Sequence, residues 1–451
     1  AVLDHIDFER REWVPHSGWP ICRKDIDPYY HLAHDLFELG EFNYEQDIWS
    51  SLGIEDQRFD PERITAGLWR FDEINERFGP AYCQDLIESP QVRILLHANA
   101  VQIQASANAQ TVQHIVIRPL TGEARNVRAR HFVVAGGAIE NARLLLASND
   151  VETQGIGNRH DQVGRYFMEH PNGRIAHVQV EQPFELWAAM QKRFMPSGPP
   201  LAPVLRLSEA TQRAWRALNS VVTFKLQRDP SRGVSLVQKV YPVLKHAMSP
   251  NRTGLALNHA YRAIRAWIHR EVRESIEHMR CRLGMTGLYM NMRGEQSPNP
   301  DSRVCLSAER DALGNLRADL DWRLSRADKH TASVFVQTFD AELKRLGLGE
   351  LQPSDWLDSA DLQWPVDPTV GNHPIGGYHH MGTTRMSTDA AHGVVTADCQ
   401  VHGYENLYVA GSSVFSTSGW ANPTLTLVAL SLRLADHLDE RLSGETSLSN
   451  E

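Results

Sequence analysis

Cysteine is scarce in this chain, and its few cysteines are not spaced to act in pairs. The five are Cys22, Cys83, Cys281, Cys305 and Cys399. No two of them have the C-x-x-C spacing that zinc knuckles and dithiol redox motifs use. A dispersed set of this kind predicts reduced thiols that serve as packing residues, so we expect a cytoplasmic protein.

Long apolar runs and an excess of positive charge are also lacking. No stretch approaches the roughly 20 apolar residues that a membrane-spanning helix needs. The formal net charge is -9, whereas a nucleic-acid-binding surface needs a basic patch for its phosphate contacts. We therefore expect neither a membrane span nor nucleic-acid binding, and the length of 451 residues predicts two globular domains.

A leader sequence and a complete Gly-rich phosphate loop are missing as well. The opening AVLDHIDFERREWVP has neither an initiator methionine nor the apolar core of a signal peptide, so we expect it to come from the middle of a longer protein. GIG at 155–157 and GGAIEN at 136–141 both lack the G-x-G-x-x-G spacing behind a first strand. Neither glycine cluster is therefore a complete dinucleotide fingerprint.

Strand and helix patterns at both ends of the chain indicate a doubly wound sheet. Strand patterns occupy 92–105 and 113–120, and HFVVAGGAIENARLLLAS (131–148) joins a buried strand through two glycines to an amphipathic helix. ENLYVAGSSVFS (405–416) is a second strand that runs into a Gly-Ser turn, followed by an apolar helix at 422–438. We predict that the strands within 92–135 and 405–410 share one dinucleotide-type sheet.

The middle of the chain has a different character. Apolar and polar residues alternate at 173–182 and 220–227, which predicts an antiparallel, half-buried sheet. Helical periodicity is present at 253–280 and 326–349, and a further helix is expected from Pro28 onward. The predicted α/β (α+β) organisation is an irregular or helical segment at 1–90, a discontinuous domain at 91–170 and 376–445, and an inserted domain at 171–375.

Two adjacent histidines in YHHMGTTRMS (378–387) leave several functions open. His379 and His380 suit a catalytic base with a neighbour, structural histidines, or, with His373, the metal site of a hydrolase. The spacing of the three fits no common zinc pattern, which argues against a metal. Gly382 would let the backbone approach a planar ligand.

The start of the last helix is a second candidate site. Asn422, Pro423 and Thr424 open it, and the free N–H groups of a first helical turn form an electropositive end. Such an end stabilises an anion, for example a reduced flavin. A plain capped helix is the alternative.

Several segments resemble the glucose-methanol-choline (GMC) flavin oxidoreductases. HHMGTTRM, together with the stretch from AHGVVTADC (391–399) to NPTLTLVALSLRLADHL (422–438), resembles the C-terminal signature of that family. VGRYFMEHP (163–171), EQSPNPDSRVCLS (295–307) and SGWPI (17–21) resemble it too. The Asn-Pro form is similar to pyranose oxidases and cholesterol oxidases. The resemblance implies a discontinuous FAD-binding domain with an inserted antiparallel-sheet substrate domain.

The resemblance also implies an activity and a set of site residues. It predicts FAD-dependent oxidation of an alcohol, a sugar or polyol hydroxyl, by proton abstraction and hydride transfer to flavin N5. His379 would be the base, Asn422 would donate to the developing alkoxide, and His380 would orient the loop or pack on the flavin. The implied FAD contacts are Val101 at the adenine end, Ala135, Gly136 and Gly137 along the dinucleotide, Gly411 and Ser412 near the ribityl and pyrophosphate, and Asn422, Pro423 and Thr424 at the helix start.

One part of the family pattern has no counterpart here. The N-terminal strand, G-x-G-x-x-G turn and helix that hold the pyrophosphate would occupy roughly the first hundred residues of the family layout. The resemblance therefore implies that an N-terminal segment, on this or another polypeptide, completes the site. The predicted electron acceptor is oxygen, a quinone or a protein. The alternative function is a flavin-free, non-catalytic subunit.

Overall fold

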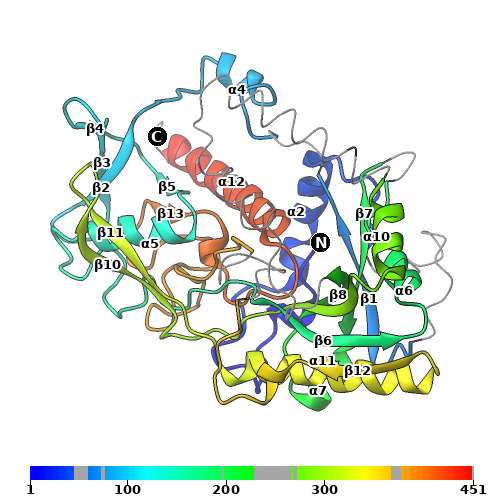
Figure 1. Cartoon of the computed structure of the whole chain (residues 1–451). Helices are drawn as coiled ribbons and strands as arrows, with labels where there is room; N and C mark the ends of the chain where they lie inside the picture. The colour runs from blue at the N-terminus through cyan, green and yellow to red at the C-terminus, as the bar shows by residue number, and fades with distance from the viewer. Residues whose placement is uncertain are drawn as a thin grey trace.

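A six-stranded antiparallel sheet is the largest sheet in the described part of the chain (Figure 1). The computed structural model describes residues 1–44, 59–72, 77–194, 198–227, 267, 272–366 and 377–448. The strands follow the order β1-β7-β8-β9-β6-β12. They are β1 (Ile64–Arg70), β6 (Asn172–Val180), β7 (Leu201–Leu207), β8 (Val221–Gln227), β9 (Gly287–Arg293) and β12 (Gly349–Pro353).

The two faces of this sheet differ, because side chains alternate along each strand. On one face Phe224 of β8 and Met290 of β9 are buried in a core that also contains Phe335 and Phe339 of α11 (Arg326–Arg345). Thr223, Lys225, Asn291 and Arg293 alternate with these apolar residues and line a cavity on the other face. The alternation at 220–227 thus predicted both a strand and its amphipathic character.

Helix α11 begins and ends where its sequence provides caps. Ser325 and Asp328 form a capping box, and the Ser325 N–H donates to Asp328 Oδ2 over 2.5 Å. The segment 326–349 was expected to be a helix that ends in a glycine stop, and the helix does end at Arg345, followed by Gly347 with a φ of 65°. Gly349 opens β12, where a Cβ atom would lie 2.0 Å from the Gln179 carbonyl oxygen of β6. Only glycine allows this close strand pairing.

A second hydrophobic core surrounds a short parallel strand pair. β5 (Phe132–Val134) pairs in parallel with β13 (Leu407–Val409), so Phe132 lies opposite Leu407 and Val134 opposite Val409. Around this pair lie α5 (Ala138–Ala147), η4 (Ser412–Val414), α12 (Pro423–Leu448) and α2 (Arg23–Leu36). α2 and α12 lie side by side in Figure 1, and the Tyr30 and Thr426 hydroxyls are joined by a 2.8 Å hydrogen bond.

The predicted single dinucleotide-type sheet is only partly correct. β2 (Asn99–Ala105), β3 (Val112–Arg118) and β4 (Arg125–Val127) form a separate three-stranded antiparallel sheet, and only β5 pairs with β13. The connections 106–111 and 119–124 are the reason. A parallel pairing needs a crossover of a dozen or more residues, whereas such short turns join antiparallel neighbours.

The first 90 residues contain more regular structure than the sequence indicated. Besides α1 (His5–Phe8), α2 and α4 (Gln84–Glu88), they supply β1, the edge strand of the six-stranded sheet. α2 begins at Arg23 rather than Pro28, because the Asp25 carboxylate accepts from the Cys22 N–H over 2.7 Å and caps the earlier start. Pro28 lies inside the helix. The domain boundaries themselves stay a prediction.

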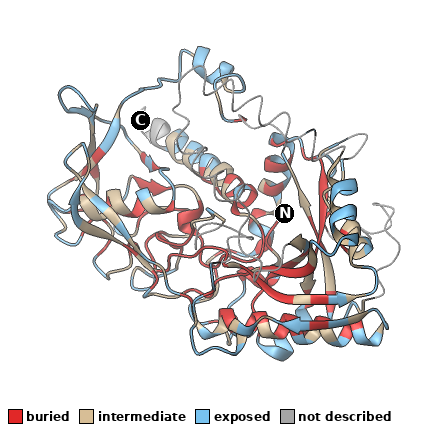
Figure 2. Cartoon of the chain, in the orientation of Figure 1, coloured by how far each residue is buried: buried red, intermediate tan, exposed pale blue. Residues whose placement is uncertain are grey.

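The remaining elements complete a mixed α/β fold with antiparallel sheets. Figure 2 shows that α10 (Arg273–Arg282), the described part of the helix expected at 253–280, is largely exposed. None of the five cysteines forms a disulfide, as their spacing predicted. In the described residues no helix combines the length and apolarity needed to cross a membrane. The other elements are α6 (Pro183–Ala189), α7 (Glu209–Trp215), β10 (Arg303–Arg310), β11 (Leu316–Asp321) and η3 (Asp355–Asp358).

Candidate active site

Three segments that are distant in sequence meet at the carboxyl ends of β5 and β13. The Gly382 N–H donates to the Ser412 carbonyl over 3.1 Å, and the Ser412 hydroxyl donates to the His380 carbonyl over 2.6 Å. The Thr383 hydroxyl donates to the Ala138 carbonyl over 2.5 Å. These bonds fix the two-histidine loop against the turns that follow both parallel strands.

Asn141 joins the two turns to each other. Its Oδ1 accepts from the Gly136 N–H over 2.6 Å, and its Nδ2 donates to the Ala410 carbonyl at 3.2 Å and the Ser413 hydroxyl at 2.9 Å. The side chain is completely buried, so these bonds satisfy both ends of its amide. Sequence reasoning missed Asn141; a polar residue on the buried side of the helix that follows Gly136-Gly137 is the available signal.

The glycines of the two turns leave open space in front of them. Gly137 and Gly411 have φ values of 88° and 106°, which favour glycine, and a Cβ atom at either would meet nothing within 4 Å. Ala135, Gly136 and Gly137 are exposed. An exposed backbone turn at the carboxyl end of parallel strands fits a dinucleotide, which binds there in open α/β sheets.

Gly382 and Val101, two further positions predicted to lie near a ligand, do not line the open space at the two turns. A Cβ at Gly382 would lie 2.2 Å from the Tyr166 carbonyl oxygen, so this glycine allows close packing against the 163–171 segment rather than approach of a ligand. Val101 lies buried in β2, outside the parallel pair, and its carbonyl accepts from Asn315 over 3.0 Å. Its contact with an adenine stays a prediction.

His379 has the properties of a proton acceptor. Its backbone N–H donates to Glu169 Oε2 over 2.7 Å, and its ring meets the His170 ring edge-on at 5.3 Å between centroids. Neither ring nitrogen has a hydrogen-bond partner among the described residues. Burial, followed by the charges of His170 and Arg293, lowers the pKa of His379 to about 3. The imidazole is therefore neutral near pH 7, with a lone pair to accept a proton.

Asn422 is oriented by an arginine that the sequence analysis did not single out. Arg293 Nη1 donates to Asn422 Oδ1 over 2.7 Å. A guanidinium can only donate, so the amide oxygen must face Arg293 and the amide NH2 is left to donate elsewhere. His170 Nε2 lies 3.2 Å from the carbonyl oxygen of Ala421, which precedes Asn422. His170 thus contacts both the His379 ring and the start of α12.

Glu169 is a buried carboxyl beside the candidate base, and it too was missed from sequence. Its two oxygens accept from the backbone N–H groups of His170 and His379, each over 2.7 Å. Oε2 lies 3.9 Å from His380 Nε2. Burial raises the pKa of Glu169 to about 7, against the lowering effect of these hydrogen bonds. A group that exchanges its proton near neutrality therefore adjoins the two histidines.

The start of α12 faces a cavity of about 240 Å³, and Pro423 is its first residue, as predicted. Asn422 and Thr424 line this cavity, whereas Pro423 is buried. The His380 ring packs against Phe167 at 5.5 Å, and its contribution to the loop stays a prediction. The described residues hold no group of three metal-ligating side chains, and His373 lies outside them.

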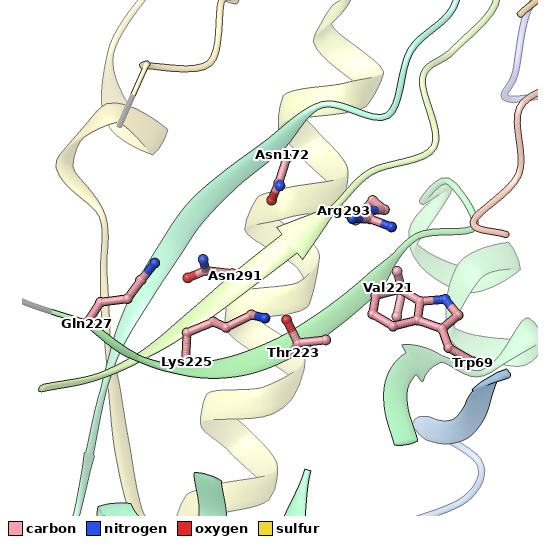
Figure 3. A pocket seen from close by; sticks show the side chains of 8 residues that line it. All are labelled: Trp69, Asn172, Val221, Thr223, Lys225, Gln227, Asn291 and Arg293. Carbon is pink, nitrogen blue, oxygen red and sulfur yellow. The ribbon is translucent and has the colours of Figure 1, made fainter. Parts of the chain in front are cut away.

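A second cavity, also of about 240 Å³, opens on the polar face of the six-stranded sheet (Figure 3). Arg293 lines it and also holds Asn422, so this cavity adjoins the candidate catalytic pair. Its walls come from β1, β6, β8 and β9. The lining residues are Trp69, Asn172, Val221, Thr223, Lys225, Gln227, Asn291 and Arg293.

Several known proteins are similar to this chain. Two curated relatives are the fructose dehydrogenase large subunit of Gluconobacter japonicus, 26% identical over 70% of this chain and 48% of that protein, and the C-glycoside 3-oxidase of Microbacterium trichothecenolyticum, 26% identical over 72% and 50%. The chain thus spans about half the length of these relatives. A solved FAD-dependent oxidoreductase from Chaetomium thermophilum is 13% identical with a TM-score of 0.47, covering 98% of this chain and 84% of that one.

The C-terminal part of the chain matches a family model. Residues 298–431 match the model described as GMC oxidoreductase. This range includes the two-histidine loop, the β13 turn and the beginning of α12, which are the segments that assemble around His379 and Asn422. The C-terminal part of the chain, residues 298–431, is therefore similar to the GMC oxidoreductase family.

Proposed function

We propose that this chain supplies the catalytic residues of an FAD-dependent oxidation of an alcohol, a sugar or polyol hydroxyl, to a carbonyl. The observation that carries the proposal is the neutral imidazole of His379, without a hydrogen-bond partner among the described residues, near an Asn422 amide whose donor end is left available by Arg293. The match of residues 298–431 to the GMC oxidoreductase model supports an oxidoreductase, and two relatives bear the names of sugar-oxidising enzymes.

FAD, when bound, supplies the acceptor for the hydride that leaves the alcohol carbon. His379 accepts the hydroxyl proton at a ring nitrogen, which its low pKa keeps unprotonated beforehand. Asn422 donates from its amide NH2 to the substrate oxygen and holds it while negative charge develops there. In its ionised form, the Glu169 carboxylate stabilises the positive charge that His379 gains, because it lies against the His379 backbone.

The turns at the parallel strands are the proposed holders of the FAD dinucleotide. Ala135, Gly136 and Gly137 on one side and Gly411 and Ser412 on the other present backbone to it, with Val101 at its adenine end. The first turn of α12, which Asn422, Pro423 and Thr424 open, would stabilise negative charge on a reduced flavin through its free backbone N–H groups, to which Pro423 contributes none. An additional N-terminal segment is proposed to hold the pyrophosphate, and oxygen, a quinone or a protein would reoxidise the flavin.

Anaerobic flavin reduction by alcohols tests this function. The purified protein, reconstituted with FAD, is mixed with a panel of sugars and polyols, and loss of flavin absorbance is followed for the wild type, His379→Ala and His392→Ala. His392 is an exposed histidine on a nearby loop and serves as the matched control. We expect reduction to fall by about 10²- to 10⁴-fold in His379→Ala only.

Two results would contradict the proposal. If bound FAD is not reduced by any alcohol in the panel, the function is wrong. If His379→Ala reduces its flavin as fast as the wild type, the base has been assigned to the wrong residue.

A further inference from the structure

The eight residues that line the cavity on the polar face of the six-stranded sheet carry positive charge only. Two of them, Lys225 and Arg293, are cationic, and none of these described residues is acidic. Asn172, Thr223, Gln227 and Asn291 add neutral hydrogen-bonding groups from three strands, as Figure 3 shows. A cavity for a neutral polyol needs donors and acceptors but has no need of two positive charges.

Lys225 lacks a counter-charge. Its ammonium group makes no hydrogen bond or ion pair with any residue that the structure describes. Lys225 as a whole residue is exposed, but desolvation of its ammonium group, followed by the charges of Arg273 and Arg293, lowers its pKa to about 8. Cations that face one cavity without an anion between them repel one another, so an anionic ligand would relieve this repulsion.

Asn291 provides a second, independent sign of a ligand. Its side chain is 5% exposed and lines the cavity, and its Oδ1 has no hydrogen-bond partner among the described residues. Buried acceptors are rarely left unpaired, because their desolvation is not compensated. A ligand hydroxyl can donate to this oxygen, so the cavity combines a cationic side with a place for a polyol.

The register of the strands orients such a ligand. Val221 pairs with Arg293 and Lys225 pairs with Tyr289, so the two cations are four residues apart along the sheet, about 13 Å between their backbones. Arg293 also holds Asn422. A ligand whose anionic group meets Lys225 therefore extends its hydroxyl-bearing carbons toward Arg293, Asn422 and the candidate base.

We propose that the cavity binds a sugar acid, with its carboxylate against Lys225 and its hydroxyls between Asn291 and Arg293. The inference rests on the proposed function for the statement that this ligand is the alcohol substrate. Binding itself does not require catalysis, so the two can be tested separately. A phosphorylated sugar shares the anionic chemistry and is the competing ligand.

Calorimetric titration of the full chain measures the preference directly. D-gluconate is compared with D-glucitol, which has the same carbon chain with a neutral hydroxymethyl group in place of the carboxylate, and with glucose 6-phosphate. We expect gluconate to bind at least about tenfold more tightly than glucitol, on the scale of one charge-assisted hydrogen bond. Its affinity should fall with added salt and as pH rises through about 8, where Lys225 loses its proton.

Three variants identify the cation. Lys225→Gln should remove the preference for gluconate and leave glucitol binding unchanged, and Lys225→Arg should retain it. Lys344→Gln is the matched control, because Lys344 is an exposed lysine at the end of α11. Melting curves of all variants report whether they fold.

The outcomes separate the inference from the proposed function. Equal binding of gluconate and glucitol, binding of neither, or a preference that survives Lys225→Gln would overturn the inference. Tighter binding of glucose 6-phosphate than of gluconate, lost in Lys225→Gln, would replace the carboxylate by a phosphate. Gluconate that binds through Lys225 without reducing the flavin would support the inference and count against the function, whereas flavin reduction by neutral sugars alone would do the opposite.

Discussion

The glycine turns after β5 and β13 and the polar face of the six-stranded sheet both adjoin His379 and Asn422, but they are built differently. The turns offer backbone: Gly137 and Gly411 leave space in front of them, and Asn141 fastens one to the other. The sheet offers side chains from four strands, with Lys225 and Arg293 as its charges. Backbone suits the proposed dinucleotide, whereas side chains can change one at a time to suit a substrate.

The largest expected change in the free energy of unfolding comes from removing the Asn141 side chain, whose hydrogen bonds join the two turns. Asn141→Ala leaves the Gly136 N–H and the Ala410 carbonyl without their partner, and we expect a loss of about 3 kcal/mol in the free energy of unfolding. Urea unfolding measures this, and flavin fluorescence should show weaker FAD uptake. Asn126→Ala, an exposed position on β4, is the control and should stay within about 0.5 kcal/mol of the wild type. Similar stability of both variants would refute the role of Asn141.

The next effect belongs to the catalytic pair, where the two regions meet. Asn422→Ala removes the donor to the substrate oxygen, and we expect flavin reduction to slow by about 10²-fold. The amount of bound FAD should stay unchanged, because alanine keeps the backbone of the helix start that is proposed to meet the flavin and removes only the side-chain amide. Stopped-flow absorbance under anaerobic conditions measures the rate, and an unchanged rate would remove Asn422 from the mechanism.

Because the pKa of Glu169 is raised in the folded protein, the free energy of unfolding should fall as pH rises. Its pKa is raised from 4.5 to about 7, so the folded state holds a proton that the unfolded state has lost. The stabilising contribution is complete below about pH 4.5 and disappears as pH rises through 7. Between pH 5 and 7 the wild type should therefore lose about 2 kcal/mol relative to Glu169→Gln. The measurement is the free energy of unfolding of the wild type and of Glu169→Gln as a function of pH. If the two curves run parallel between pH 5 and 7, Glu169 does not titrate in that range.

The smallest expected effect comes from adding a methyl group at Gly137. It tests whether the open space in front of this glycine is occupied by the cofactor. Gly137→Ala and Gly403→Ala both place an alanine at positive φ with nothing within 4 Å of its Cβ, so each should cost about 1 kcal/mol. Gly403 lies before β13, at the end of the strand opposite Gly411. Only Gly137→Ala should weaken FAD binding, as a fluorescence titration would show. Equal FAD affinities would mean that the space at Gly137 is not used by the cofactor.

The features that could be predicted from sequence are those formed by residues that are neighbours in the chain. The Gly136-Gly137 and Gly411 turns, the two-histidine loop and the Asn-Pro start of α12 are each contiguous in sequence. The structure joins the first three at the ends of β5 and β13, and it places the start of α12 against Arg293 of β9. The interpretation of Gly382 was wrong, because a glycine required by a ligand and a glycine required by a packed backbone look alike in sequence. The pairing of β2 and β3 was also misjudged, since strand patterns do not specify partners.

The amino-acid sequence by itself determined the mixed α/β character, the glycine turns and the histidine that has the chemistry of a base. Local periodicity, caps and turn residues depend on neighbours in the chain, so they can be recognised without a fold. Only the tertiary structure decided that Arg293 orients Asn422, that Glu169 lies beside His379, and that Lys225 and Asn291 face one cavity. These pairings depend on strand register and burial, which bring residues up to about 200 positions apart into contact, and burial is also what sets their pKa values.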